Sequence, residues 1–327
     1  MLFGIMPAGD VLEVGAPAVN GPAMKSLFLD CNDQLAPVWQ RVIRADDPPI
    51  DVNRAPFERN DLPRVLKGYA ICIDDHSYLP THVVDECDAL KHIVFLGTGP
   101  ASYMSLADLA ARGIKVHIIR NYGDTAVAEH GIALVFAACR DIARMDREVR
   151  AGIWVPHEGV QLLGKTLGVI GLGGIGREVL RIGRGLGMEV IAWNRTPRSG
   201  APLVALDELL ARSDVISLNL TLNDETRGFL GAAQIARMKP GVILVNTARA
   251  ALVDEAALLD GLRSGRIRHA GLDVFHDEPL KRDHPLVQME NVTLTAHAAF
   301  RTLEASMTLL RRAIDIVRDI VGGKAVS

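Results

Sequence analysis

The sequence is short of cysteine and carries no excess charge of one sign. It has four cysteines among 327 residues, none in a C-x-x-C spacing. This scarcity argues against a disulfide framework or any metal site, and it predicts buried free thiols in a reducing compartment. The 36 Lys and Arg residues nearly balance the 39 Asp and Glu residues and are spread along the chain. The basic stripe that nucleic-acid binding needs is therefore missing.

Long hydrophobic runs are also missing. The longest apolar run, Gly131–Cys139, is too short to span a bilayer. Residues 1–23 have no basic n-region and contain Asp10 and Glu13, which argues against a secretory signal. After Met24 the chain reads "KSLFLD", typical of a first strand, so 1–23 is predicted to be an N-terminal extension outside the fold. Together these features predict a cytoplasmic protein with no membrane association.

What the sequence does contain is a regular alternation of strand-like and helix-like segments, in a length that allows roughly two domains. From Leu167 onward, runs rich in Val, Ile and Leu are typical of strands covered on both faces. These runs cover 167–172, 189–194, 214–220, 241–246, 269–274 and 291–295. A weaker alternation in the N-terminal third covers 26–31, 70–73, 92–97 and 114–119. The pattern predicts doubly wound parallel sheets. A long helical stretch, about 125–150, is predicted to join the two regions, and a last helix, about 303–321, to pack back on the first.

The segment "GLGGIG" has the G-x-G-x-x-G spacing of a dinucleotide-binding turn, directly after a strand-like run and at the start of a helix. In such a turn, Gly171 permits the tight bend, Gly173 lets a pyrophosphate approach the backbone, and Gly176 lets helix and strand pack closely. The helix N-terminus, with Gly174 and Ile175, would then present free N–H groups to the phosphates. The alternative is an ordinary turn between a strand and a helix.

The end of the second strand bears on the choice of nicotinamide cofactor. An acid at this point would bond the ribose 2′-hydroxyl of NAD, but the residue there is Asn194. Arg195, Thr196 and Arg198 follow it, and two cations with a hydroxyl suit a 2′-phosphate. NADP is therefore favoured over NAD. If these arginines are merely solvated, either cofactor would bind.

Three polar residues each come just past a different strand-like run. Arg249 follows "GVILVN", Glu278 follows "HAGLDV" and His297 follows "NVTLT". Because the carboxyl ends of parallel strands share one edge of a sheet, the three are expected to lie beside the glycine turn. Taken singly, each has an ordinary interpretation: a structural histidine, a solvated cap and a loop charge. Their joint appearance favours an active site.

The chemical types of these residues fit one reaction. Hydride transfer between a nicotinamide and a carbonyl carbon needs a proton at the oxygen, and histidine, with an unperturbed pKa of about 6.5, suits that task. A carboxylate on the far ring nitrogen fixes the tautomer. A guanidinium grips a substrate carboxylate at two points. The set predicts a reductase of small 2-oxoacids.

Five long segments support this interpretation: "NYGDTAVAEHGIAL", "GKTLGVIGLGGIGREV", "MKPGVILVNTARAALVDEAAL", "GLDVFHDEPL" and "NVTLTAHAAF". They resemble segments of the D-isomer-specific 2-hydroxyacid dehydrogenases, and the resemblance covers nearly the whole chain from Met24. It implies that Arg249 binds substrate, that Glu278 supports the histidine and that His297 is the acid/base. It also implies a Rossmann cofactor domain (124–298), a smaller flavodoxin-like substrate domain (24–123 plus 299–327), an active site between them, and a homodimer built on the cofactor domain.

The resemblance suggests further contacts. Thr98 and Gly99, in "FLGTGPASY", match the loop whose backbone holds the substrate carboxylate, with a plain glycine turn as the alternative. His76 and Ser77 are candidates for the opposite wall, with a surface loop as the alternative, and Asp273 is a candidate cofactor contact. The chain departs from the family pattern at Ala250, Ala296, Ser105, Phe300 and Arg301, which leaves the substrate open.

Glyoxylate and hydroxypyruvate are the expected substrates. A dinucleotide-sensing or corepressor-like protein without turnover is the alternative, because the family's fold also serves such proteins. The resemblance argues against a formate-type relative, in which glutamine would replace Glu278.

Overall fold

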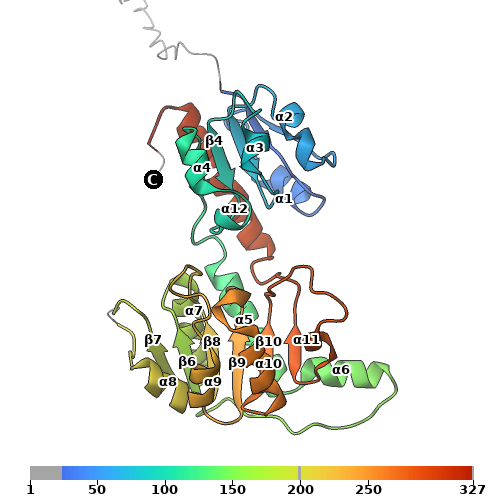
Figure 1. Ribbon diagram of the computed structural model, residues 1–327, viewed down its shortest axis with the longest axis vertical. Coiled ribbons are helices and arrows are strands. Elements are labelled where there is room, and N and C mark those ends of the chain that lie inside the picture. The colour runs from blue at the N-terminus through green and yellow to red at the C-terminus, as the bar shows by residue number, and fades with distance from the viewer. Residues whose placement is uncertain (1–23, 198–199, 326–327) are drawn as a thin grey trace, which may run out of the picture.

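The computed structural model describes residues 24–197 and 200–325, which form two α/β domains, each built on a parallel sheet (Figure 1). The predicted extension (1–23) and Arg198 lie outside the described residues. Within the described ranges, no helix combines the length and apolar character needed to cross a membrane. All four cysteines are buried and free, as predicted.

The first sheet has the strand order β2-β1-β3-β4-β5 and is parallel throughout. Its strands are β1 (Ser26–Phe28), β2 (Ile50–Val52), β3 (Ile71–Asp74), β4 (His92–Phe95) and β5 (Lys115–Ile118). The helices around it are α1 (Leu35–Val42), α2 (Leu62–Val65), α3 (Thr81–Val84) and α4 (Leu106–Ala111). This strand order is that of flavodoxin-like domains, so the predicted fold class is confirmed for this domain.

The second sheet has the order β11-β10-β9-β8-β6-β7, also parallel. Its strands are β6 (Thr166–Ile170), β7 (Glu189–Trp193), β8 (Val215–Leu218), β9 (Val242–Asn246), β10 (Ile267–Leu272) and β11 (Val292–Leu294). The helices are α5 (Asp124–Cys139), α7 (Gly174–Gly185), α8 (Leu206–Arg212), α9 (Ala232–Arg237), α10 (Glu255–Arg263) and α11 (Pro285–Gln288). The chain places β7 on one side of β6 and then adds β8, β9, β10 and β11 in turn on the other side. The strand order therefore reverses at β6, as in a Rossmann domain.

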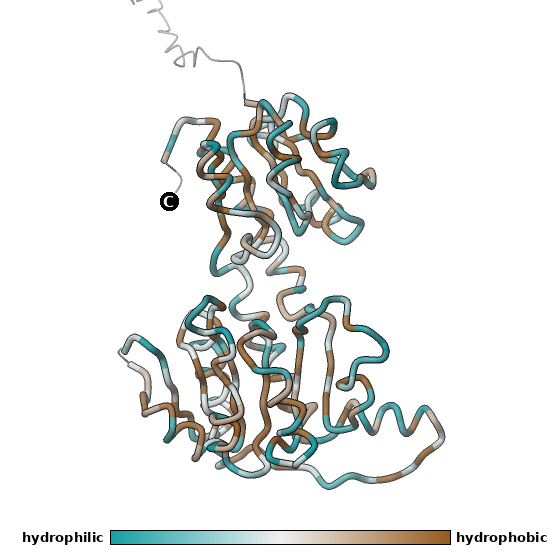
Figure 2. Tube along the Cα trace, in the orientation of Figure 1, coloured by the Kyte–Doolittle hydropathy of each residue, from teal (hydrophilic) through white to brown (hydrophobic). Residues whose placement is uncertain are grey.

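The core of each domain lies on both faces of its sheet, and the strands are the most hydrophobic part of the chain (Figure 2). Every residue of β9 is buried, as expected for a strand covered by helices on both sides. Because such strands need apolar side chains at every position, their sequences read as continuous Val, Ile and Leu runs.

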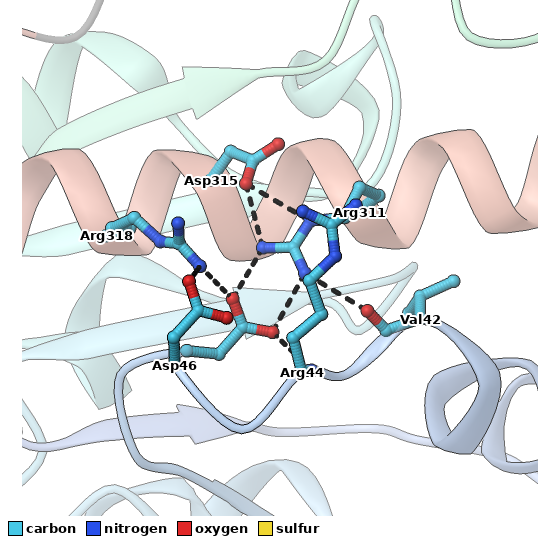
Figure 3. A network of polar contacts seen from close by, with 7 residues as sticks. Val42, Arg44, Asp46, Arg311, Asp315 and Arg318 are labelled. Atoms are coloured by element: carbon cyan, nitrogen blue, oxygen red, sulfur yellow. Dashed lines mark hydrogen bonds and ion pairs between the residues drawn. The ribbon is translucent and has the colours of Figure 1, made fainter.

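The last helix, α12 (Leu303–Val321), packs on the first sheet. Leu310, Ile314 and Val317 are fully buried in the same core as Phe28 and Trp39. Polar contacts add to this packing, because the carboxylate of Asp47 accepts from Arg311 at 2.7 and 2.8 Å and also pairs with Arg318. Figure 3 shows these two arginines on α12, facing the segment that carries Arg44 and Asp46. The chain therefore returns to the first domain, while the proposed domain boundaries stay a prediction.

The long helical stretch predicted at 125–150 is helical in the structure but is broken once. The structure has α5 and then α6 (Ile142–Arg150), separated by Asp141 in the left-handed region at φ +49°. Aspartate tolerates this conformation better than most residues. Its carboxylate lies 3.2 Å from Nδ1 of the buried His269 in β10, which holds the break against the sheet.

Candidate active site

The three polar residues predicted at strand ends lie at the carboxyl ends of adjacent strands in the second sheet. Arg249, Glu278 and His297 follow β9, β10 and β11, which are adjacent parallel strands. His297 Nδ1 lies 2.7 Å from Glu278 Oε2, a hydrogen-bond distance. Both side chains are partly exposed, at 37% and 36%. Among the described residues, the other ring nitrogen, Nε2, forms no hydrogen bond.

A rigid backbone loop holds His297. Its φ is +50°, unusual for a residue other than glycine. The amide of His297 donates to the carbonyl of Asp273 at 2.9 Å, and the amides of Ala298 and Ala299 donate to the Asp273 carboxylate at 3.0 and 2.9 Å. The strained backbone is thus fixed by bonds to one residue of the neighbouring strand end.

The carboxyl group of Asp273 lies beneath this loop and is fully buried. Thr295 donates to it at 2.6 Å, and the ring of His130 lies 3.5 Å away. Burial raises the pKa of Asp273, but the bonds from His130, Thr295 and the two loop amides outweigh it and lower that pKa below its ordinary value. The structure therefore places this candidate cofactor contact under the histidine loop as its anchor, and contact with the cofactor stays a prediction. His130 and Thr295 were not predicted, since a lone histidine on a helix gives no signal.

Arg249 reaches from the second domain to the first. A turn shaped by the buried Asn246 presents it: the Asn246 amide donates to the Arg249 carbonyl at 2.9 Å and accepts from Ala248 N at 3.0 Å. Its Nη2 lies 2.9 Å from the point where a Cβ would stand on Gly99. The predicted guanidinium and the predicted glycine loop therefore meet, and a side chain at position 99 would have to displace the guanidinium. Thr98, the other candidate in this loop, is exposed.

His76 and Ser77 lie on a turn after β3. The His76 ring packs edge-on against Tyr103 and Phe95, with centroids 5.1 and 5.6 Å apart, and Ser77 Oγ donates to Asp30 at 2.7 Å. Burial raises the pKa of Tyr103, the charge of Arg249 opposes that rise, and the charge of Glu278 adds to it. The charges of Arg249 and Glu278 therefore both act on Tyr103.

A second tyrosine lies nearby at the crossing between the domains. Burial raises the pKa of Tyr122 to about 12, again opposed by the charge of Arg249. Its ring packs against Phe300, one of the departures from the family pattern. Neither tyrosine was predicted, although both lie in quoted motifs.

The glycine turn has the shape that a dinucleotide requires. Gly171 has φ +96°, and a side chain there would meet the carbonyl of Asn219. A side chain at Gly176 would strike the Gly171 carbonyl. No described atom lies within 4 Å of a Cβ built on Gly173, the N-cap of α7. An open approach to a free helix N-terminus fits a pyrophosphate.

Two other residues of this turn differ in their surroundings. Gly174 faces the carboxylate of Asp124, which a side chain would displace. Ile175 is partly buried and packs against the core of the second domain.

The end of β7 carries the residues predicted to select the cofactor. Asn194 accepts from Leu172 N at 2.9 Å and donates to the Thr196 carbonyl at 2.6 Å, so its side chain ties the glycine turn to this strand end. Arg195 forms an ion pair with Glu225, and both side chains are exposed.

Comparisons with known proteins agree with this arrangement. The family described as "D-isomer specific 2-hydroxyacid dehydrogenase, NAD binding domain" matches residues 132–299. The D-3-phosphoglycerate dehydrogenase of Archaeoglobus fulgidus is 38% identical over 274 residues, which are 81% of this chain and 51% of that protein. The chain thus spans about half the length of this relative.

Two relatives are matched over most of their length. The glycerate dehydrogenase of Methylorubrum extorquens is 36% identical over 269 residues, which are 79% of this chain and 85% of that protein. A crystal structure of a glyoxylate reductase from Paecilomyes thermophila has a TM-score of 0.82 at 28% identity, covering 94% of this chain and 98% of that one. From the family match and these relatives, the chain belongs to the D-isomer specific 2-hydroxyacid dehydrogenases.

Proposed function

We propose that the protein catalyses hydride transfer between NAD(P)H and a small 2-oxoacid, giving a 2-hydroxy acid. The observation that carries this proposal is the 2.7 Å contact between His297 and Glu278, at the sheet edge where Arg249 reaches Gly99. An acid/base, its orienting carboxylate and a carboxylate-binding cation are the parts that this reaction needs.

Each side chain then has one task. The bound nicotinamide supplies the hydride. Arg249 and the backbone at Gly99 hold the substrate carboxylate from the two domains, and this two-point grip fixes the carbonyl carbon. His297 Nε2 delivers a proton to the carbonyl oxygen. Glu278 holds Nδ1–H, which fixes the tautomer and stabilises the imidazolium before transfer.

Glyoxylate and hydroxypyruvate are the proposed substrates, because two of the relatives are a glycerate dehydrogenase and a glyoxylate reductase. A panel of 2-oxoacids assayed with NADPH and NADH tests the proposal by the specificity constant for each pair. If the protein binds the cofactor but oxidises neither NADPH nor NADH with any 2-oxoacid, the proposal is contradicted and a cofactor-sensing protein is favoured.

A preference for NADP belongs to the same proposal. Arg195 and Thr196 lie at the end of β7, where the adenosine ribose of a Rossmann cofactor is bound. The ion pair of Arg195 with Glu225 is exposed and is worth at most about 1 kcal/mol, so the guanidinium is free to turn toward a 2′-phosphate. We expect a higher specificity constant with NADPH, reduced in Arg195→Ala. A higher value with NADH in the wild type would contradict this.

We also propose a cytoplasmic homodimer. The helix α6 and the chain after it project from the second domain (Figure 1) and expose a row of large apolar side chains. Ile142 and Val149 lie on α6, Ile153, Trp154 and Val155 follow it, and Phe136 of the preceding helix α5 is exposed as well. Trp154 is 84% exposed, and large apolar side chains that are exposed together on one segment, and not scattered singly, mark a candidate protein interface.

A further inference from the structure

Three aspartates meet at the ends of β1 and β3, which are neighbours in the first sheet. Asp30 accepts three hydrogen bonds, from Asp75 N at 2.8 Å, His76 N at 3.1 Å and Ser77 Oγ at 2.7 Å. The carboxylate of Asp75 contacts the His76 ring at 2.8 Å. These bonds hold the turn at 75–77, which carries His76 against Tyr103.

Asp74 differs from its two neighbours. It is fully buried, and its Oδ1 accepts one bond, from Ser77 N at 3.1 Å. Its Oδ2 is buried and has no hydrogen-bond partner among the described residues. If Asp74 were ionised, it would be a buried charge that accepts only one hydrogen bond among the described residues. It would also lie beside the carboxylate of Asp30, which accepts three. A neutral carboxylic acid avoids that cost.

The surrounding groups favour the neutral form. Burial raises the pKa of Asp74 well above its ordinary value, and the negative charge of Asp30 raises it further. The other titratable groups that interact with these two acids are Cys31 after β1, Cys72 on β3, Asp75 and His76 on the turn, and Tyr103 from the loop after β4. Burial also raises the pKa of Asp30, but its three donors stabilise the charged form. The shared proton therefore belongs on Asp74.

We propose that Asp74 is a protonated acid that donates to the carboxylate of Asp30, and that this pair positions the turn bearing His76 at the substrate. This inference rests on the proposed function for its catalytic consequence, and Asp74 acts as a positioning residue. Loss of the proton would place two adjacent carboxylates in a buried site, and their repulsion would displace the turn. Activity would then fall at alkaline pH in both reaction directions.

The oxidation of D-glycerate separates this effect from the proton transfer by His297. In that direction the histidine acts as a base, and alkaline solution does not impair a base. A fall in the specificity constant at still higher pH then reports on Asp74. The variant Asp74→Asn has the shape of the neutral acid and cannot ionise. We expect near-normal KM at neutral pH and no alkaline fall, whereas Asp74→Ala raises KM roughly tenfold or more because the turn loses its support.

An infrared measurement tests the proton without turnover. A neutral carboxyl group absorbs at a higher frequency than a carboxylate, so wild type at neutral pH should show a band that is absent in Asp74→Asn. The matched control Asp85→Asn removes an exposed acid paired with Arg112 and should leave the band unchanged. Absence of the band in wild type, or an unchanged alkaline fall in Asp74→Asn, overturns the proposal. A band that persists in a protein with no turnover would uphold the proton assignment and reject only the enzymatic function.

Discussion

Removing the carboxylate of Asp47 should destabilise the first domain by several kcal/mol. Its side chain is 2% exposed and accepts from two nitrogens of Arg311, one of Arg318 and the amide of Arg44 (Figure 3). Breaking a buried pair by deleting one partner costs about 3–5 kcal/mol. Arg311 would keep Asp315 as a partner, so we expect Asp47→Ala to lower the free energy of unfolding by about 3 kcal/mol, at the lower end of this range.

Urea unfolding followed by Trp39 fluorescence measures this change. Trp39 is buried in the same core as α12, and replacing Trp154 and Trp193 by Phe isolates its signal. Asp315→Ala is the matched control, because it removes an exposed acid from the same guanidinium and should cost at most about 1 kcal/mol. An equal, small loss in both variants would refute the argument that the buried carboxylate fastens the helix.

The pH dependence of this stabilisation has a definite sign. Hydrogen bonds from Arg311, opposed by burial, hold the pKa of Asp47 well below its ordinary value. A depressed folded-state pKa means that the stabilisation is complete above the unfolded pKa of about 3.9 and is lost as pH falls below it. The difference in unfolding free energy between wild type and Asp47→Asn should therefore be constant from neutral pH down to about 4 and shrink in stronger acid.

Four other substitutions test the site and the interface. His297→Ala should lower kcat by about 10²–10⁴ while cofactor binding, followed by fluorescence titration, survives; near-normal turnover would remove the acid/base assignment. Arg249→Lys keeps the charge but loses the two-point grip, so KM for the 2-oxoacid should rise strongly in steady-state assays, and an unchanged KM would mean that the carboxylate is held elsewhere. Gly99→Val should push the guanidinium away and lower kcat/KM roughly tenfold or more with unchanged cofactor affinity, and wild-type kinetics would contradict the contact seen between the two loops. Trp154→Ser should convert a dimer to monomers in analytical ultracentrifugation, and an unchanged mass would exclude this surface as the interface.

The sequence predicted the fold class, and the position of Arg249, Glu278 and His297 after three adjacent strands, for one physical reason. Strands covered on both faces appear as continuous apolar runs, and the ends of adjacent parallel strands must share an edge. The end of the sheet at which such a residue lies therefore follows without any knowledge of side-chain packing. The glycine turn follows from the same logic, because its spacing has meaning only between a strand and a helix.

Other features depend on contacts between distant segments and gave no local signal. The break at Asp141 requires His269, which lies on a strand of the sheet that α5 covers. The approach of Arg249 to Gly99 depends on how the two domains sit together, which no period in the sequence encodes. Tyr103 and Tyr122 are linked to the site by the charge of Arg249, which lowers the pKa of both tyrosines, and this effect depends on tertiary structure.

Two aspartates show why residue type alone could not describe the site. Asp74 ends β3 and Asp273 directly follows β10, so both are fully buried acids at the carboxyl end of a parallel strand. Burial alone would raise the pKa of each. Asp273 receives donors from a histidine, a threonine and two amides and so remains a carboxylate, whereas Asp74 receives one amide and lies against another acid. The tertiary structure brings several hydrogen-bond donors to Asp273 and only one to Asp74. Asp273 therefore anchors its loop as a charged acceptor, whereas Asp74, as proposed above, anchors its turn as a neutral donor.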